Sequence, residues 1–308
     1  MSYVNANKRP KDVFIDSNTF TAIHDSVYPI IHVEFYTTGQ VYLTGNTFYD
    51  SSSEQDMIEL DANEAIILEN NTFEYCIEKS NGFLRTGTAH TVNVTGLVVT
   101  HTVGGTSTTT SPLFIIGTKD LGECNFEYSN FNSNHLKDSI LDIDQSVGLI
   151  SFHDNTAYNE TVHSYTSYIK IENPYELKMT QTTFINTTDD KTNEQLTQLV
   201  SFESINLNEY GEIHMDEIVL SNTSISFFSI NAVSGATSIK KEIIFENITI
   251  KDGYYEARNP LINLGPFYTD QDVHLGLSNL TFSRLVFEDT SNIIHINWQS
   301  PTPITIEG

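Results

Sequence analysis

Three short segments of the chain repeat one pattern of apolar and polar positions. Each starts with an apolar residue, continues with two corner residues and ends in Asn-Thr-Phe, at Ile15–Phe20, Leu43–Phe48 and Leu68–Phe73. Weaker copies begin at Val94, Phe126, Phe152, Met179, Leu220, Phe245 and Leu277. Their spacing is near 26 residues with occasional insertions. Such a period indicates a solenoid whose loops grow outward from fixed coils.

Short runs with alternating apolar residues lie between these copies, at Ile30–Phe35, Met57–Leu60, Ser139–Ile143, Tyr168–Ile171, Leu199–Phe202 and Ile293–Ile296. Each repeat therefore holds at least two short strands. A leucine-rich repeat would need a helical half, and a propeller blade would need a longer unit. The pattern predicts an all-β protein, a right-handed parallel β-helix of about ten to eleven coils, with residues 1–308 as a single domain.

The repeated template also predicts two internal columns of side chains. Asparagines at a repeated corner can stack as an amide ladder that satisfies the turn backbone, and we expect this of Asn18, Asn46, Asn71, Asn130 and Asn155. Phenylalanines at the last template position would form an aromatic stack inside the coils, from Phe20, Phe48, Phe73, Phe131, Phe184 and Phe282. Both columns are structural predictions.

Three polar insertions interrupt the period, near residues 102–112, 186–197 and 251–260. Long loops on one face of a solenoid are the usual place for binding, and the third insertion carries Tyr254 and Tyr255. The last residues, Pro303–Gly308, have the pattern of a strand that starts another coil. An open parallel edge invites another chain, so we expect either a segment of a longer solenoid or a unit that self-associates end to end.

The acidic composition bears on partners and location. A formal charge of −25 repels nucleic acid and anionic membranes, and it attracts cations or a basic partner. No stretch has the length of a membrane-spanning helix, and the first residues contain no apolar signal region. We predict no nucleic-acid partner and no membrane insertion.

The Asn-Thr-Phe copies, together with Glu69–Cys76 and Phe152–Asn155, resemble the degenerate repeats of pectin-lyase-like β-helix surface proteins. The pattern is similar to that of polymorphic outer-membrane adhesins and of large protist surface proteins. The resemblance spans nearly the whole chain, although the Gly-Gly-Ala-Ile half of the adhesin repeat is missing. It implies adhesion or a structural surface layer, with no catalytic residues to transfer.

Few residues point to enzymatic chemistry or to a metal. The four arginines, Arg9, Arg85, Arg258 and Arg284, lie near no acidic cluster of the kind that a uronate lyase needs. The ten histidines show no metal-ligand spacing, so no metal site and no required cofactor are predicted. A weak Ca²⁺ site at Asp142 and Asp144, or at Asp189 and Asp190, is left open. Cys76 and Cys124 are about two coils apart, so we expect free or buried thiols.

Seven Asn-X-Ser/Thr sequons occur, at Asn70, Asn93, Asn159, Asn186, Asn222, Asn247 and Asn279. With 28 Asn and 64 Ser plus Thr residues, roughly six are expected by chance, so their number is no evidence. Asn70, Asn222, Asn247 and Asn279 share one template position, and the last three would carry a column of N-linked glycans in a secreted protein.

The function that these patterns favour is structural. We expect a non-catalytic, glycosylated β-solenoid outside the cell or on its surface, as part of a fibre, coat or adhesin stalk. A carbohydrate-binding adhesion module is the first alternative, with surface glycans bound by Tyr254 and Tyr255 or by Trp298. A polysaccharide lyase or hydrolase is the second.

Overall fold

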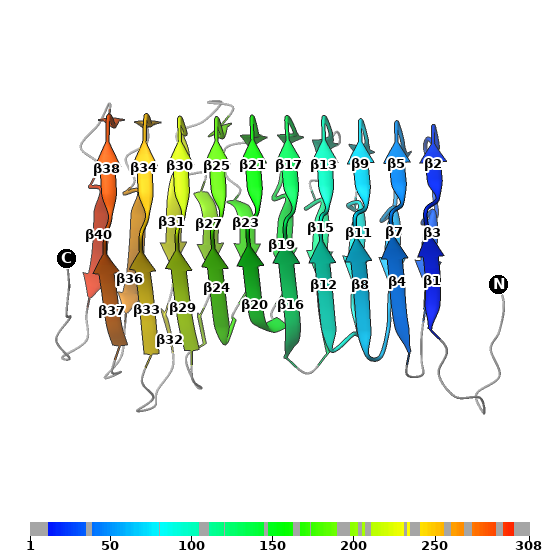
Figure 1. The fold of residues 1–308 in the computed structure, drawn as a ribbon, viewed down its shortest axis with the longest axis horizontal. Coiled ribbons are helices and arrows are strands. Elements are labelled where there is room, and N and C mark those ends of the chain that lie inside the picture. The colour runs from blue at the N-terminus through cyan, green and yellow to red at the C-terminus, as the bar shows by residue number, and fades with distance from the viewer. Residues whose placement is uncertain are drawn as a thin grey trace.

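The chain folds as a parallel β-helix with no helix among the residues described (Figure 1). The computed structural model describes residues 12–34, 39–79, 81–104, 111–119, 121–144, 147–162, 167–172, 174–189, 198–202, 205–206, 211–230, 233–234, 241–255, 260–267, 273–287 and 292–298. All pairs between the described strands are parallel, and each strand pairs with its counterpart one coil away. The all-β, parallel β-helix prediction is confirmed.

Two sheets of ten strands make up one side of the molecule, and we name them A and B. Sheet A contains β1 Val13–Asp16, β4 Gln40–Thr44, β8 Ala65–Glu69, β12 Thr91–Thr95, β16 Gly122–Glu127, β20 Val147–His153, β24 Glu176–Thr180, β29 Gly211–Asp216, β33 Lys241–Glu246 and β37 Val273–Ser278. Sheet B contains β2 Thr19–Thr21, β5 Thr47–Tyr49, β9 Thr72–Glu74, β13 Val98–Thr100, β17 Asn130–Asn132, β21 Thr156–Tyr158, β25 Thr183–Ile185, β30 Val219–Ser221, β34 Thr249–Lys251 and β38 Thr281–Ser283.

The remaining strands close each coil. Short strands form sheet C, with β6 Ser52–Ser53, β10 Ile77–Glu78, β14 Val103–Gly104, β18 His135–Leu136, β22 Thr161–Val162 and β26 Thr188–Asp189, and a separate pair, β35 Tyr254–Tyr255 and β39 Val286–Phe287. Sheet D returns the chain with β3 Ile31–Val33, β7 Ile58–Leu60, β11 Leu84–Thr86, β15 Phe114–Ile116, β19 Leu141–Ile143, β23 Ser167–Ile171, β27 Gln198–Phe202, β28 Ile205–Asn206, β31 Ser226–Ile230, β32 Val233–Ser234, β36 Ile262–Phe267 and β40 Ile294–Trp298. Among the described residues sheet C has six strands, and the complete coils are slightly fewer than the ten to eleven expected.

The register of sheet A confirms nine of the ten template copies and corrects one. Ile15 pairs with Leu43, Leu43 with Leu68, and so on to Met179. Met179 then pairs with Met215 rather than with a residue at position 220. Leu220 instead lies on sheet B, opposite Phe184. The eighth copy was misplaced because Ile218 and Val219 replace the Asn-Thr pair of the template, although its corner residues Asp216 and Glu217 are still polar.

Every coil turns twice through the left-handed backbone region. The first corner joins sheet A to sheet B, and the second joins sheet B to the next short strand. Positive φ values occur at the first corner at Ser17, Gly45, Asn70, Gly96, Tyr128, Asp154, Gln181, Glu217, Asn247 and Asn279, and at the second at Ala22, Asp50, Tyr75, His101, Ser133, Asn159, Asn186, Asn222, Asp252 and Arg284. Asparagine tolerates this conformation better than most residues, which explains its recurrence at these corners.

The asparagine ladder is real but shorter than expected. Asn18 Nδ2 donates to Asn46 Oδ1 at 3.0 Å, and Asn46 Nδ2 donates to Asn71 Oδ1 at 3.2 Å. Buried Leu97 takes the next position and ends the ladder. Asn155 also joins two coils, because its Nδ2 donates to the carbonyl of Phe126 in the preceding coil at 3.0 Å.

Asn130 does not belong to this ladder. It is the first residue of β17, exposed on the outside of sheet B, and the ladder position of its coil is occupied by Ser129. Ser129 N donates to Asn155 Oδ1 at 2.9 Å. The prediction failed because Asn130 was aligned one residue out of register, and one residue turns a side chain to the opposite face of a strand.

The phenylalanines of the template share one inward position on sheet B, but they form a continuous stack only at the first coils. Phe20, Phe48 and Phe73 stack with centroids 4.7 Å and 4.8 Å apart. Further along the column, apolar residues of other sizes separate Phe131, Phe184 and Phe282, namely Val99, Ala157, Leu220 and Ile250. Where Ala157 leaves room, Tyr168 from sheet D packs edge-on against Phe131 and Phe184.

Candidate metal-binding cluster on sheet A

Three potential metal ligands meet on the outer surface of sheet A. In β29 the apolar Ile213 and Met215 point inward and are buried, so the alternating His214 and Asp216 point outward. Asp216 pairs with Glu246 of β33 in the parallel register, which sets Glu246 on the same outer face. The solenoid thus brings together residues about 30 positions apart in the sequence.

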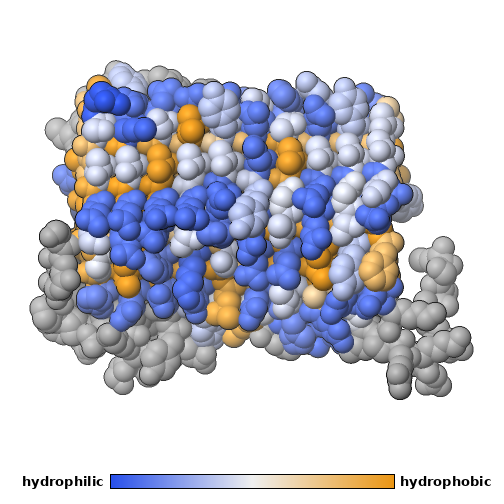
Figure 2. Space-filling view, viewed as in Figure 1, coloured by the Kyte–Doolittle hydropathy of each residue, from blue (hydrophilic) through white to orange (hydrophobic). Residues whose placement is uncertain are grey.

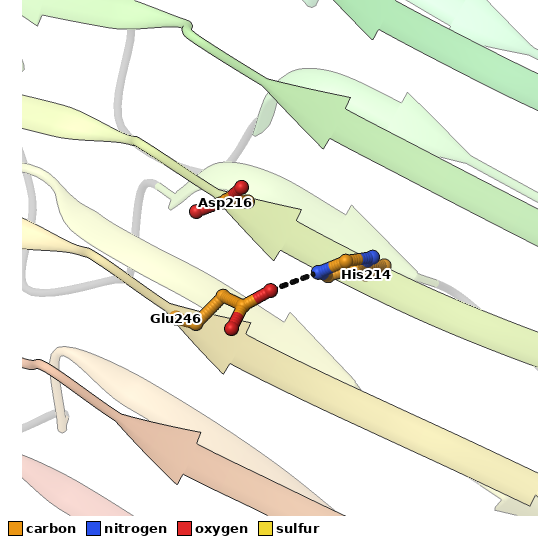
Figure 3. Close-up of side chains that lie close together, drawn as sticks. All are labelled: His214, Asp216 and Glu246. Carbon is orange, nitrogen blue, oxygen red and sulfur yellow. Dashed lines mark hydrogen bonds and ion pairs between the residues drawn. The ribbon is translucent and has the colours of Figure 1, made fainter.

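One ligand atom from each of His214, Asp216 and Glu246 lies within 4.8 Å of the others, and all three residues are partly exposed (Figure 3). His214 Nε2 is 2.7 Å from Glu246 Oε1. The other ring nitrogen, Nδ1, is 3.8 Å from Glu212 Oε1. Asn247 Nδ2 donates to Asp216 Oδ1 at 2.7 Å and fixes that carboxylate. The cluster forms the kind of mixed nitrogen and oxygen set that divalent metals use.

The surroundings of the cluster are acidic. Glu212 and Glu242 face each other across β29 and β33, next to the cluster along the strands. Lys178 lies opposite His214 on β24, and its ammonium group pairs with Glu176. Hydrophilic residues gather over this part of sheet A, at the lower left of the molecule in Figure 2. The field at the cluster therefore favours a cation.

The sequence pattern missed this cluster for one reason. An alternating His-X-Asp pair with a carboxylate one coil later is a usable signal, but it needs the correct register. The displaced eighth template copy removed that register in this part of the chain. The correct register aligns Met179 with Met215 and Met215 with Phe245. In that register His214 and Asp216 lie next to Glu246.

Six of the seven sequon asparagines lie at the left-handed corner positions. Asn70, Asn247 and Asn279 lie at the first corner, while Asn93 lies on the outer face of β12. The other three, Asn159, Asn186 and Asn222, lie at the second corner. The placement of Asn222 corrects the expectation that it aligns with Asn247 and Asn279.

The second-corner sequons form an exposed amide column. Asn186 Nδ2 donates to Asn159 Oδ1 at 2.9 Å, and Asn222 Nδ2 donates to Asn186 Oδ1 at 2.8 Å. The serine or threonine of each sequon falls two residues later, on or beside the strand that follows the corner. The fold thus accounts for the sequons by itself, and glycosylation at all seven positions stays a prediction.

Among the described residues, neither acidic pair considered for Ca²⁺ belongs to a close group of three or more potential ligands. Asp142 Oδ2 lies 3.4 Å from Lys170 Nζ, so a lysine already neutralises it. Asp190 lies outside the described residues, as do residues 105–110, 190–197 and 256–259 of the three insertions. A weak Ca²⁺ site stays a prediction.

The aromatic residues proposed to bind glycans differ in their exposure to solvent. Tyr255 is buried, its hydroxyl is 2.9 Å from the Thr223 hydroxyl, and its ring stacks on Phe287. Tyr255 is therefore a core residue rather than a surface ligand. Tyr254 is 37% exposed, and the side chain of Trp298 lies outside the described part.

Both cysteines are free and buried, as expected. Burial raises the pKa of the Cys76 thiol to about 11 and that of Cys124 still further, so neither thiol is a nucleophile at neutral pH.

A buried carboxyl group lies at the second corner. Glu160 is fully buried, and Asn134 Nδ2 donates to its two oxygens at 3.0 Å and 3.2 Å. The Tyr168 hydroxyl donates to Oε2 at 3.3 Å. Burial raises the pKa of Glu160 to about 8, so its side chain is mostly neutral at pH 7. Its inaccessible position makes it part of the core rather than of a binding site.

Two internal cavities are lined entirely by described residues. Their volumes are about 20 Å³, beside Phe131, Ala157 and Tyr168, and about 10 Å³, beside Phe73 and Phe114. Each is large enough for about one water molecule at most, and each is apolar. The interior at these places is packed core, which leaves the outer faces as the candidate binding surfaces.

The described residues include no helix that is long and apolar enough to cross a membrane. Comparisons of the chain with protein-family models, with curated proteins and with solved structures found no match.

Proposed function

We propose that this chain is a non-catalytic structural β-solenoid, located outside the cell or on its surface, that forms part of a fibre, coat or adhesin stalk. The observation that carries the proposal is the partial exposure of apolar side chains in the two outermost described coils. Their inward-facing apolar residues are only partly buried, which contrasts with the fully buried core between them. These residues are Val13, Ile15, Phe20, Ile30 and Val33 at one end and Leu280, Phe282, Leu285, Phe287, Ile294 and Ile296 at the other.

Stacking further coils on these ends would bury that surface and extend the parallel sheets. Within the described residues no strand pairs with the outer edge of β1 or of β37, and exposed parallel edges are templates for another chain. The resemblance of the repeats to pectin-lyase-like and outer-membrane-adhesin β-helices supports a surface role. The occupant that we favour is a second copy of the chain, stacked end to end.

Electron microscopy of the purified chain tests the proposal. We expect fibres with an axial repeat near 4.8 Å. The variant Ile15→Lys puts a charge on the inward face of the first described coil and should abolish the fibres. Phe14→Lys is the matched control, because Phe14 is 67% exposed on the outer face of the same strand and should leave assembly intact. Discrete monomeric rods for the unmodified chain at all concentrations would refute end-to-end stacking.

Polysaccharide cleavage is the second candidate, and the carboxylates of Asp216 and Glu246 favour it. Two carboxyl groups on one outer face are the minimum machinery of a glycosidase. Because the same face is acidic, a neutral polysaccharide is a better substrate class than a uronate polymer. Release of reducing ends from neutral polysaccharides by the unmodified chain, lost in Glu246→Gln, would establish this activity in place of the structural role.

A further inference from the structure

We propose that His214, Asp216 and Glu246 bind one divalent transition-metal cation, with zinc as the representative ion. The inference goes beyond the structural role, because it assigns a specific ligand to one face of one pair of coils. It rests on geometry, on the groups around the three ligands and on their donor chemistry.

The geometry suits a single ion. Bonds from zinc to imidazole nitrogen and carboxylate oxygen are about 2.0–2.2 Å long, so two ligands of one ion lie about 3–4.4 Å apart. The three candidate atoms already lie within 4.8 Å of one another. Small side-chain rotations would bring them to bonding distance, and the backbones of β29 and β33 would stay in place because each is hydrogen-bonded on both edges.

The surrounding groups also match those of metal centres. A metal-bound histidine usually donates its other ring N–H to a carboxylate, which orients the ring and raises its basicity. Both ring nitrogens of His214 face carboxylates, Nε2 that of Glu246 and Nδ1 that of Glu212. When Nε2 binds the ion together with Glu246, Glu212 is the partner for Nδ1. Asn247 orients Asp216 in the same way.

The donor set selects the class of cation. Calcium and magnesium prefer six or more oxygen ligands, whereas imidazole favours zinc and its first-row neighbours. Three protein ligands on a partly exposed face also leave coordination positions for water. The nearby Glu212 and Glu242 add negative charge, and the lysine opposite His214, Lys178, is paired with Glu176.

A second histidine–glutamate pair in the chain provides a matched control. His32 Nδ1 lies 2.9 Å from Glu59 Oε2 on the outer face of sheet D. Among the described residues, no third ligand closes a cluster of the same tightness around this pair. Loss of His32 removes one surface histidine without touching the proposed site.

Isothermal titration of the full chain with ZnCl₂ tests the proposal. We expect one equivalent of Zn²⁺ to bind the unmodified chain and the His32→Ala control with equal affinity. His214→Ala, Asp216→Asn and Glu246→Gln should each weaken that affinity by about ten-fold or more. Excess Ca²⁺ should not displace the zinc. Circular dichroism spectra identical to that of the unmodified chain would show that the three surface variants remain folded.

Three results would overturn the assignment. One is binding of Zn²⁺ by His214→Ala as tightly as by the unmodified chain, which would place the zinc elsewhere on the acidic surface. Another is the absence of a saturable zinc equivalent in the unmodified chain. The third is displacement of the bound zinc by Ca²⁺, which would show that the site prefers a cation that binds oxygen ligands. Assembly into fibres is measured separately, so failure of this proposal leaves the structural role untouched.

Discussion

At the residue scale, the burial and hydrogen bonding of each polar side chain depend on which face of its strand or corner it occupies. Asn46 is buried at the first corner, where its Nδ2 donates to the carbonyls of Ile15 and Thr44 at 2.8 Å and 3.0 Å. Its Oδ1 accepts from the backbone and side chain of Asn18. Asn130 belongs to a similar sequence but points into solvent from β17.

This contrast predicts different costs for the same substitution. Asn46→Ala removes the side-chain donor to the part-buried carbonyls of Ile15 and Thr44 and the acceptor of the Asn18 backbone N–H, and should lower the free energy of unfolding by about 1–3 kcal/mol. Asn130→Ala should change it by no more than about 0.5 kcal/mol. Urea denaturation followed by circular dichroism measures both. Equal effects of the two substitutions would contradict the register described for these corners.

Glu160 predicts a pH dependence of stability. Its pKa is about 8 in the folded chain against an ordinary value of 4.5, because burial disfavours the charged form. The unfolded chain therefore releases this proton at lower pH than the folded chain. The stability that neutral Glu160 contributes is complete below about pH 4.5, declines as pH rises and is lost above about pH 8.

Glu160→Gln stays neutral at every pH and should remove this decline. Between pH 4.5 and pH 8 the variant should gain on the order of 4 kcal/mol relative to the unmodified chain. Chemical denaturation at several pH values measures the difference, with Glu127→Gln on the outer face of β16 as the control. A difference that does not grow with pH would show that Glu160 is ionised inside the fold.

At the scale of the elements, the inward column of sheet B shows how coils share one core. Phe48 is fully buried between Phe20 and Phe73, and Phe282 occupies the same position in the last described coil, where it is only partly buried. The coil with Ala157 solves the packing differently, because Tyr168 crosses from sheet D to fill the space. Volume is therefore matched within a coil rather than by strict repetition of phenylalanine.

The cost of truncating a phenylalanine should follow its place in this column. Phe48→Ala opens a cavity between two stacked rings and should cost about 3–5 kcal/mol. Phe282→Ala should cost clearly less in the monomer, because part of its ring is already in contact with water. The free energies of unfolding of the two variants can be compared by thermal or urea denaturation. A larger loss for Phe282 in the monomer would mean that other residues cover that end.

At the scale of the whole molecule, two opposing forces act on end-to-end association. The partly buried apolar residues of the outermost described coils favour stacking, while a formal charge of −25 on each chain opposes it. Salt screens the repulsion, because the Debye length falls from about 30 Å at 0.01 M to about 8 Å at 0.15 M ionic strength. The apolar contact itself is affected far less.

Association should therefore increase with ionic strength. Sedimentation velocity at constant protein concentration should show monomeric rods at low salt and longer species near physiological salt. The Ile15→Lys variant should remain monomeric under both conditions, and Phe14→Lys should behave as the unmodified chain. Dissociation on adding salt would instead indicate that charge pairs hold the copies together.

The repeat, the strand content and most of the core could be predicted from the amino-acid sequence. Apolar alternation and the Asn-Thr-Phe template depend only on local periodicity, so they identified nine of ten sheet A strands and the inward phenylalanines. The register across insertions, and across the copy in which Ile218 and Val219 replace Asn-Thr, follows only from the packing of neighbouring coils. The tertiary structure moved Asn130 and Asn222 to other faces, buried Tyr255, and joined His214 and Asp216 to Glu246. Which residues of neighbouring coils come into contact depends on the length of every loop between them. A local sequence pattern does not contain this information.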